Sequence, residues 1–205
     1  MKPILLLTLL IVFGFSGLAI AQCNTDPNEI GIFWSEDCGS CQTCLNQTSG
    51  TATAYVILIN ATTPAGVSGY NFCLTNADGS AFSPPPTVEV HHYILPPHAI
   101  NVFDPPCFEV AFNTPIPWSA CITLLSIEMQ IFDSAQWCFG VKSNPAVPGG
   151  MIFVDGADPN NLLAMHPNTG PDAEDFAMAC LNDPDCLSPV STEGSAWGTL
   201  KSLFR

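Results

Sequence analysis

The chain has very few cationic side chains: four Lys and Arg against 18 Asp and Glu give its 205 residues a formal net charge of −14. Lys2, Lys201 and Arg205 lie near the ends, so the body of the chain carries only Lys142. Nucleic acids and anionic lipids are both bound through Lys and Arg, so the composition excludes both as partners. Cationic partners and metal ions stay open, beside the simpler interpretation of a surface kept soluble by self-repulsion.

Long apolar runs are also absent after the first 21 residues, because no later stretch approaches the roughly 20 apolar residues of a membrane span. Residues 1–21 contain Lys2, an apolar run from Ile4 to Phe15, and the small-residue exit Ala19-Ile20-Ala21. This order is typical of a cleavable export signal. We expect cleavage near Ala21 and a mature chain that is secreted or on the cell surface (periplasmic or extracellular), and not transmembrane.

Catalytic signatures are missing as well. The sequence contains neither G-x-S-x-G nor H-E-x-x-H. The neighbouring acids Glu36 and Asp37 are predicted to lie in a solvated loop, as are Glu174 and Asp175. We therefore assign no catalytic residue. A non-enzymatic role is favoured, although the sequence alone does not decide it.

What the chain does have is a series of short runs rich in β-branched and aromatic residues, separated by Pro, Gly and Asn-Asp turns. No helical period is convincing before residue 172, whereas a turn or two of helix is expected within Ala173–Leu181. This pattern predicts an all-β fold, an immunoglobulin-like sandwich of about 7–9 short strands with a loop-rich C-terminal wrap from Gly156 to Ser191. The expected division is a signal peptide (1–21), a sandwich domain (22–191) and a tail (192–205). The predicted strands are Ile30–Trp34, Thr51–Asn60, Val67–Thr75, Thr87–Leu95, Phe108–Asn113, Thr123–Phe132, Gln136–Lys142 and Met151–Val154.

Ten cysteines follow the predicted signal, and in an oxidising compartment they read as a disulfide framework. Cys180 and Cys186 bracket a turn and are expected to pair; Cys73–Cys107 and Cys121–Cys138 are suggested as staples between strands. Cys38, Cys41 and Cys44 form C-x-x-C-x-x-C, which could instead hold zinc or an iron–sulfur cluster with a fourth ligand such as Cys23. Disulfides are the favoured interpretation. The candidates are Cys23, Cys38, Cys41, Cys44, Cys73, Cys107, Cys121, Cys138, Cys180 and Cys186.

No cofactor is predicted, and calcium is kept as an alternative. The oxygen-rich stretch from Asp155 to Asn161 includes Asp158 and Asn160 and could bind Ca²⁺, but its spacing is not that of an EF-hand loop. Asx-rich turns usually satisfy their own backbone instead. The adjacent His91 and His92 are expected to point to opposite faces of a strand, and so not to share a metal.

Three segments resemble known families. Val67-Ser68-Gly69-Tyr70-Asn71-Phe72 is similar to early strands of cohesin-like and other immunoglobulin-like secreted modules, which implies a sandwich and, by analogy alone, a dockerin-type partner. The stretch Ala99–Val110 and the tail WGTLKSLFR look like an uncharacterised family of exported bacterial β-rich proteins with a Trp-Gly-x-x-Lys-x-x-aromatic-basic C-terminus. That resemblance implies no activity.

The tail suggests a second address signal. Trp197, Gly198, Lys201, Phe204 and Arg205 belong to a short aromatic and cationic segment that could be read by export or sorting machinery. Because Trp197, Leu200, Leu203 and Phe204 share a helical face, the segment could equally dock on the sandwich as a helix. The sequence thus indicates a secreted or surface module that binds another surface protein or a glycan. The alternative is a secreted metal-binding or hydrolytic enzyme using the Cys38–Cys44 or Asp155–Asn161 loop.

Overall fold

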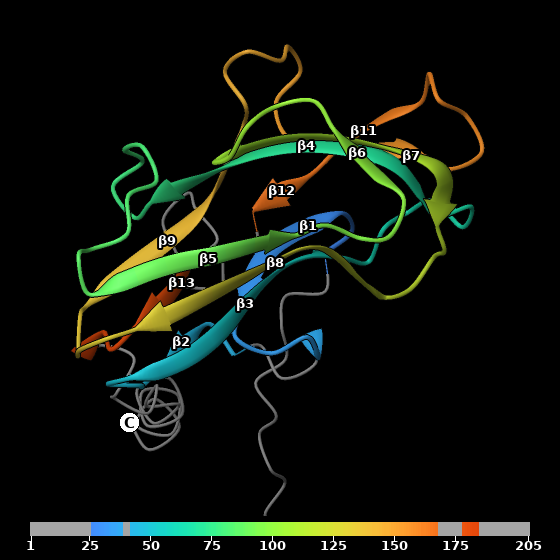
Figure 1. Ribbon diagram of the computed structural model, residues 1–205. Helices are drawn as coiled ribbons and strands as arrows, with labels where there is room; N and C mark the ends of the chain where they lie inside the picture. Colours follow the sequence, from blue (N-terminus) through green and yellow to red (C-terminus); the bar gives the residue numbers. More distant parts are fainter. Residues whose placement is uncertain (1–25, 39–41, 168–177, 185–205) are drawn as a thin grey trace, which may run out of the picture.

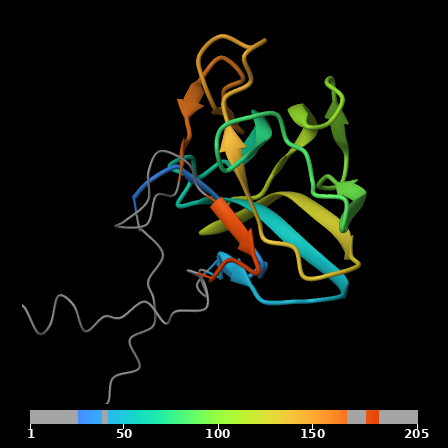
Figure 2. The ribbon, with the colours of Figure 1, turned by 90° about the vertical axis from the view of Figure 1, so that its left-hand side faces the viewer.

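Two β-sheets pack face to face as a sandwich (Figures 1 and 2) in the computed structural model, which describes residues 26–38, 42–167 and 178–184. The predicted all-β sandwich is confirmed, with thirteen strands in the described part instead of 7–9, because several two- to four-residue strands carry no periodic signal. The predicted signal peptide (1–21), residues 192–205 and Glu174-Asp175 lie outside the described residues. The strands are β1 (Glu29–Phe33), β2 (Cys44–Leu45), β3 (Gly50–Ile59), β4 (Val67–Asn76), β5 (Val88–Ile94), β6 (Ala99–Asn101), β7 (Cys107–Ile116), β8 (Cys121–Ile131), β9 (Trp137–Lys142), β10 (Ile152–Asp155), β11 (Leu162–Ala164), β12 (His166–Pro167) and β13 (Met178–Leu181).

The first sheet has five strands in the order β12-β1-β3-β8-β5, so β5 is its edge strand. The second sheet has eight strands along the path β11-β10-β4-β9-β13-β2, with β7 paired to β4 and β6 to β7. In Figure 1, β3, β8 and β5 lie side by side in one layer, and β4, β6 and β7 lie in the other. Within the described residues, no helix has the length and apolar character needed to cross a membrane.

These segments form strands because every second side chain along them is buried between the sheets. Along β8, buried Ile122, Ile127 and Met129 alternate with half-buried polar residues, which places one face in the core and the other outside. Large aromatic side chains from the second sheet, such as Phe72 and Phe139, fill the space between the layers. Each such side chain contributes about 1.5–3 kcal/mol by leaving water.

Two glycines occupy positions where a Cβ atom would come too close to a neighbouring backbone. Gly66, at the turn after Pro64, has φ +84°, and a Cβ there would overlap the backbone of Ile116. Gly69 lies at a register irregularity between β4 and β7, and its Cα approaches Val110 so closely that a Cβ would stand 2.8 Å from the Val110 carbonyl oxygen. A glycine inside a strand often marks such a bulge or close approach of another backbone.

The C-terminal region differs from the prediction. Met178–Leu181 is strand β13, not the end of a helix, and it pairs antiparallel with β9 (Figure 2). Ala179 and Leu181 are fully buried while Cys180 between them is half-buried, which is the period of a strand. A run of four residues is too short for periodicity to distinguish the two structures. Within the expected loop-rich wrap, the described residues also include the short strands β11 and β12, which extend the sheets.

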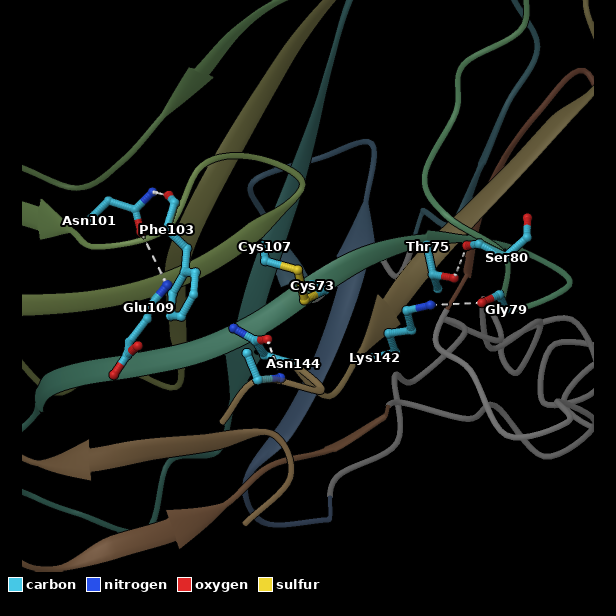
Figure 3. The surroundings of a disulfide bond; sticks show 11 residues. Cys73, Thr75, Gly79, Ser80, Asn101, Phe103, Cys107, Glu109, Lys142 and Asn144 are labelled. Atoms are coloured by element: carbon cyan, nitrogen blue, oxygen red, sulfur yellow. Dashed lines mark hydrogen bonds between the residues drawn. A yellow bond between two sulfur atoms is a disulfide. The ribbon is translucent and has the colours of Figure 1, made fainter. Parts of the chain in front are cut away.

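Three disulfides are defined within the described residues. Cys73 and Cys107 lie opposite each other in the β4–β7 register with Cα atoms 4.0 Å apart, and they are paired as predicted (Figure 3). The other two bonds join Cys138 to Cys180, with Cα atoms 4.1 Å apart, and Cys38 to Cys121, with Cα atoms 6.0 Å apart.

The predicted pairs Cys121–Cys138 and Cys180–Cys186 are therefore wrong. Cys121 and Cys138 stand on the outer faces of different sheets, because each alternates with side chains buried between the layers. Cys180 lies directly opposite Cys138 in the β9–β13 register, so strand pairing brings these two sulfurs together. Local spacing in the sequence does not reveal that pairing.

Candidate binding face

The outer face of the first sheet carries three cross-strand rows of exposed and half-exposed side chains on β3, β8 and β5. The first row contains Thr53, Glu128 and His92, the second Tyr55, Ser126 and Ile94, and the third Thr51, Gln130 and Glu89. The residues that alternate with them, among them Ala52, Ile127 and Met129, are buried in the core. Strand alternation therefore displays a mixed polar, aliphatic and aromatic surface on a rigid sheet. We call these nine residues the binding face.

The other half of the same outer surface is covered. Phe33, Ile57 and Ile59 form a second apolar cluster there with Cys38, and Tyr55 and Cys121 pack against it. The Cys38–Cys121 disulfide ties the loop after β1 to the start of β8 and so holds this cover in place. The cover stops short of β5, whose residues Glu89, His91, His92 and Ile94 are exposed.

A groove of about 420 Å³ continues from the second row of the binding face. Ile94 and Ser126 belong to both, and the groove extends between the Pro96-Pro97 turn after β5 and Ile116-Pro117 at the end of β7. Its polar groups are Glu36, Ser119, Thr123 and Ser126. The groove is therefore mostly aliphatic with a carboxylate at one side.

The position of Glu36 is set by several contacts. Its Oε1 accepts a hydrogen bond from the Thr123 hydroxyl at 3.4 Å. The loop that carries it is closed by a 2.7 Å hydrogen bond from the Trp34 backbone N–H to the Gln42 carbonyl, and the Trp34 indole N–H donates to the carbonyls of Thr43 and Cys180. The exposed Glu36 and Asp37 lie in a loop, as the sequence predicted.

The cysteine cluster does not assemble as a metal site from its described members. Cys38 and Cys44 are both disulfide-bonded, and Cys41 and Cys23 lie outside the described residues. A sulfur in a disulfide is not available as a thiolate ligand. Among the described residues, the one group whose ligand atoms converge is Cys138, Cys180 and Asp183, and its two cysteines are bonded to each other. Cys138 Sγ lies 3.2 Å from Asp183 Oδ2, and because a disulfide sulfur carries no proton, it donates no hydrogen bond to this carboxylate.

The Asp155–Asn161 loop makes the hydrogen bonds of Asx turns. Asp155 Oδ1 accepts from the Ala157 backbone N–H at 2.9 Å and from the Thr63 hydroxyl at 2.6 Å, and its Oδ2 accepts from the Asn161 side-chain amide at 3.0 Å. These bonds, first the one from Ala157, hold the pKa of the Asp155 carboxyl below its usual range. Asp158 Oδ1 accepts from the backbone N–H of Asn160. The loop thus satisfies its own polar groups, and the calcium alternative stays untested.

The two adjacent histidines depart from the expected geometry. A register shift between Val90 and His92 interrupts the alternation of β5, and both His91 and His92 are exposed with ring centroids 6.3 Å apart. His91 Nε2 also lies 3.8 Å from a Glu89 carboxylate oxygen.

The sequence predicted strand β5 but not its bulge, and it did not identify the binding face. The signal that could have found the face is the polar set that alternates with apolar residues along β8.

No protein-family model and no curated protein matches this chain. Solved structures that resemble it include cohesins. A non-cellulosomal cohesin from the archaeon Archaeoglobus fulgidus is 9% identical over 69% of this chain and 86% of that chain, with a TM-score of 0.42. The third cohesin of ScaC from Acetivibrio cellulolyticus, solved in complex with the ScaB dockerin, is 10% identical over 67% and 92%, with a TM-score of 0.42. A type II cohesin domain from the cellulosome of Acetivibrio cellulolyticus is 12% identical over 77% and 96%, with a TM-score of 0.39. Values this low assign neither a family nor a ligand, so the function is argued from the chain's own surface.

Proposed function

We propose that the protein is a non-enzymatic binding module of the cell surface or extracellular space that holds a protein partner on the β3–β8–β5 face. The observation that carries this proposal is the partial cover of the first sheet. A disulfide-held loop covers one part of its outer surface, whereas the three rows of the binding face are exposed or half-exposed. A flat face with Tyr, His and aliphatic side chains on a rigid scaffold suits recognition of another surface.

The groove chemistry supports binding over catalysis. Nucleophilic catalysis by Ser119, Thr123 or Ser126 usually relies on a neighbouring His base, and the described lining contains no His. Its one carboxylate, Glu36, is exposed and lies 3.4 Å from the Thr123 hydroxyl. Cys121, which also lines the groove, is held in a disulfide. The groups present can donate and accept hydrogen bonds and cover apolar surface, which is what a binding site requires.

Site-specific photo-crosslinking tests the binding face directly. A benzophenone amino acid would replace Gln130 on the face, and Asn113, exposed on β7 of the other sheet, would serve as the control position. In the native cells, we expect irradiation to yield a discrete crosslinked species from position 130 and not from 113. Equal crosslinking from both positions, or crosslinking from 113 alone, would contradict the proposal.

We further propose that export delivers the module and that residues 196–205 act in sorting or attachment. The three disulfides fit an oxidising compartment, which supports export. The support for a sorting role is the composition of the tail, where Lys201 and Arg205 stand beside Trp197 and Phe204 in an otherwise acidic chain.

Deleting residues 196–205 distinguishes the two interpretations of the tail. A sorting segment predicts a changed location of the protein with an unchanged melting temperature. An unchanged location with a lower melting temperature would identify the segment as a helix docked on the sandwich, and the sorting role would be wrong.

A further inference from the structure

We infer that the groove beside the binding face receives a Lys or Arg side chain of the protein partner, presented between aliphatic residues. This inference rests on the binding role proposed above and adds the chemistry of the partner. It follows from three features of the groove: its walls, its carboxylate and the charge of the chain around it.

The walls fit an aliphatic stem. Pro96 and Pro97 form one side and Ile116 and Pro117 the other, while Ile94 keeps 45% of its surface exposed at the entrance. Proline rings fix their backbone torsions, so these walls are preorganised. Lys and Arg cover such apolar surface with their methylene chains while the charged end stays hydrated. Among the described residues, no aromatic ring lines the groove, whereas a glycan would be expected to stack on one.

The carboxylate of Glu36 is the group that would pair with the charged end of the Lys or Arg side chain. It is held by the Thr123 hydroxyl and by a loop tied to β8 through the Cys38–Cys121 disulfide. The hydrogen bond from Thr123 favours a carboxylate position over the groove, which lowers the conformational entropy lost when Glu36 pairs with a cation. A Lys or Arg side chain that lies along the proline walls can bring its charged end to Glu36.

The chain itself has few cationic side chains that could pair with the Glu36 carboxylate in place of a partner's. Within the described residues the single Lys or Arg is Lys142, whose Nζ donates to the Gly79 carbonyl at 2.8 Å (Figure 3), and it does not line the groove. The net charge of −14 also attracts cationic partners over longer distances. The groove therefore selects for a cation with an apolar stem and apolar neighbours.

A pair of short peptides tests this inference. The purified ¹⁵N-labelled protein is titrated with acetyl-Leu-Lys-Leu-amide and with acetyl-Leu-Gln-Leu-amide, and amide chemical shifts are followed by NMR. We expect shifts centred on Ile94, Thr123 and Ser126, and roughly threefold to fivefold tighter binding of the Lys peptide, which is the range of an exposed ion pair. That preference should vanish in Glu36→Gln and at about 0.5 M NaCl. It should persist in Glu109→Gln, the matched change on β7.

Four results would overturn the inference. Equal affinity for the two peptides, or a preference that survives Glu36→Gln, would show that the carboxylate does not select a cation. Shifts confined to the rows around Glu128 and Gln130 would exclude the groove yet leave the binding face intact, so this failure is distinct from failure of the proposed function. A Lys preference that appears only after residues 196–205 are deleted would show that the chain's own tail occupies the groove.

Discussion

At the residue scale, the most consequential hydrogen bond joins the two sheets. The β3–β8 register shifts between Val56 and Ile57, which leaves Leu124 as the extra residue of a bulge in β8. The hydroxyl of buried Tyr70, on β4 of the other sheet, donates to the Leu124 carbonyl. Burial raises the pKa of Tyr70 far above its usual range, so the hydroxyl keeps its proton. The carbonyl that the bulge removes from the ladder is thus satisfied.

Tyr70→Phe is expected to lower the free energy of unfolding by about 1–3 kcal/mol, because it leaves a buried carbonyl without a donor. Urea denaturation measures the change. The control is Tyr93→Phe, which removes a half-buried hydroxyl that has no hydrogen-bond partner within the described residues, and which should cost less than about 0.5 kcal/mol. Equal losses in the two variants would contradict the role given to Tyr70.

Glu29 makes stability depend on pH. It is 3% exposed on β1, and burial together with the carboxylate of Asp26 raises its pKa from 4.5 to about 7. The folded state therefore holds a proton that the unfolded state releases between these two values. The sign follows from linkage: the contribution of Glu29 to stability is largest below about pH 4.5 and is lost as pH rises toward 7.

Glu29→Gln should remove this component. Between about pH 5 and pH 7.5, wild type is expected to lose more free energy of unfolding than the variant loses. Urea denaturation at both pH values measures the difference. The same pH dependence in both proteins would show that the environment of Glu29 does not shift its pKa.

At the element scale, the long alternating strands were predictable and the pairings were not. The runs around Tyr55, Phe108 and Ile127 carry enough β-branched and aromatic residues to identify β3, β7 and β8 within three residues at each end. Strand β13 was missed because its four residues are strand only through pairing with β9, about forty positions earlier. The same dependence on register, and on which face a residue occupies, explains why two of the three suggested cysteine pairs were wrong.

The Cys38–Cys121 disulfide is expected to stabilise the folded state and to hold the loop after β1 over the sheet. It closes 83 residues, and removing it with Cys38→Ala and Cys121→Ala should lower the free energy of unfolding by about 2–4 kcal/mol. The variant should also uncover Ile57 and Ile59, which increased binding of an apolar dye would reveal. Comparable dye binding by wild type and variant would mean that the loop stays in place without the bond.

At the scale of the whole molecule, the net charge of −14 favours cationic partners in the role proposed above. The composition predicted that partners would not be nucleic acids, and the described surface adds a specific carboxylate, Glu36, beside an aliphatic groove. No sequence pattern could reveal that groove, because its walls come from segments near residues 36, 95, 117 and 123 that only the fold brings together.

Self-repulsion of this charge is expected to lower stability at low ionic strength. With a net charge of −14, the melting temperature should rise when NaCl is increased from about 10 to 300 mM, because salt screens repulsion among exposed carboxylates. Differential scanning calorimetry measures this shift. A melting temperature that falls over that range would show that attractive ion pairs dominate instead.

The central claim is that one face of the sandwich holds a protein partner. Hydroxyl-radical footprinting of the protein alone and with the partner recovered by crosslinking tests it most directly. The account predicts that protection is concentrated on Tyr55, His92 and Ile94, while exposed side chains of the second sheet, such as Leu162, react equally in both states. Protection of Leu162 with unchanged reactivity of Tyr55, His92 and Ile94 would contradict it.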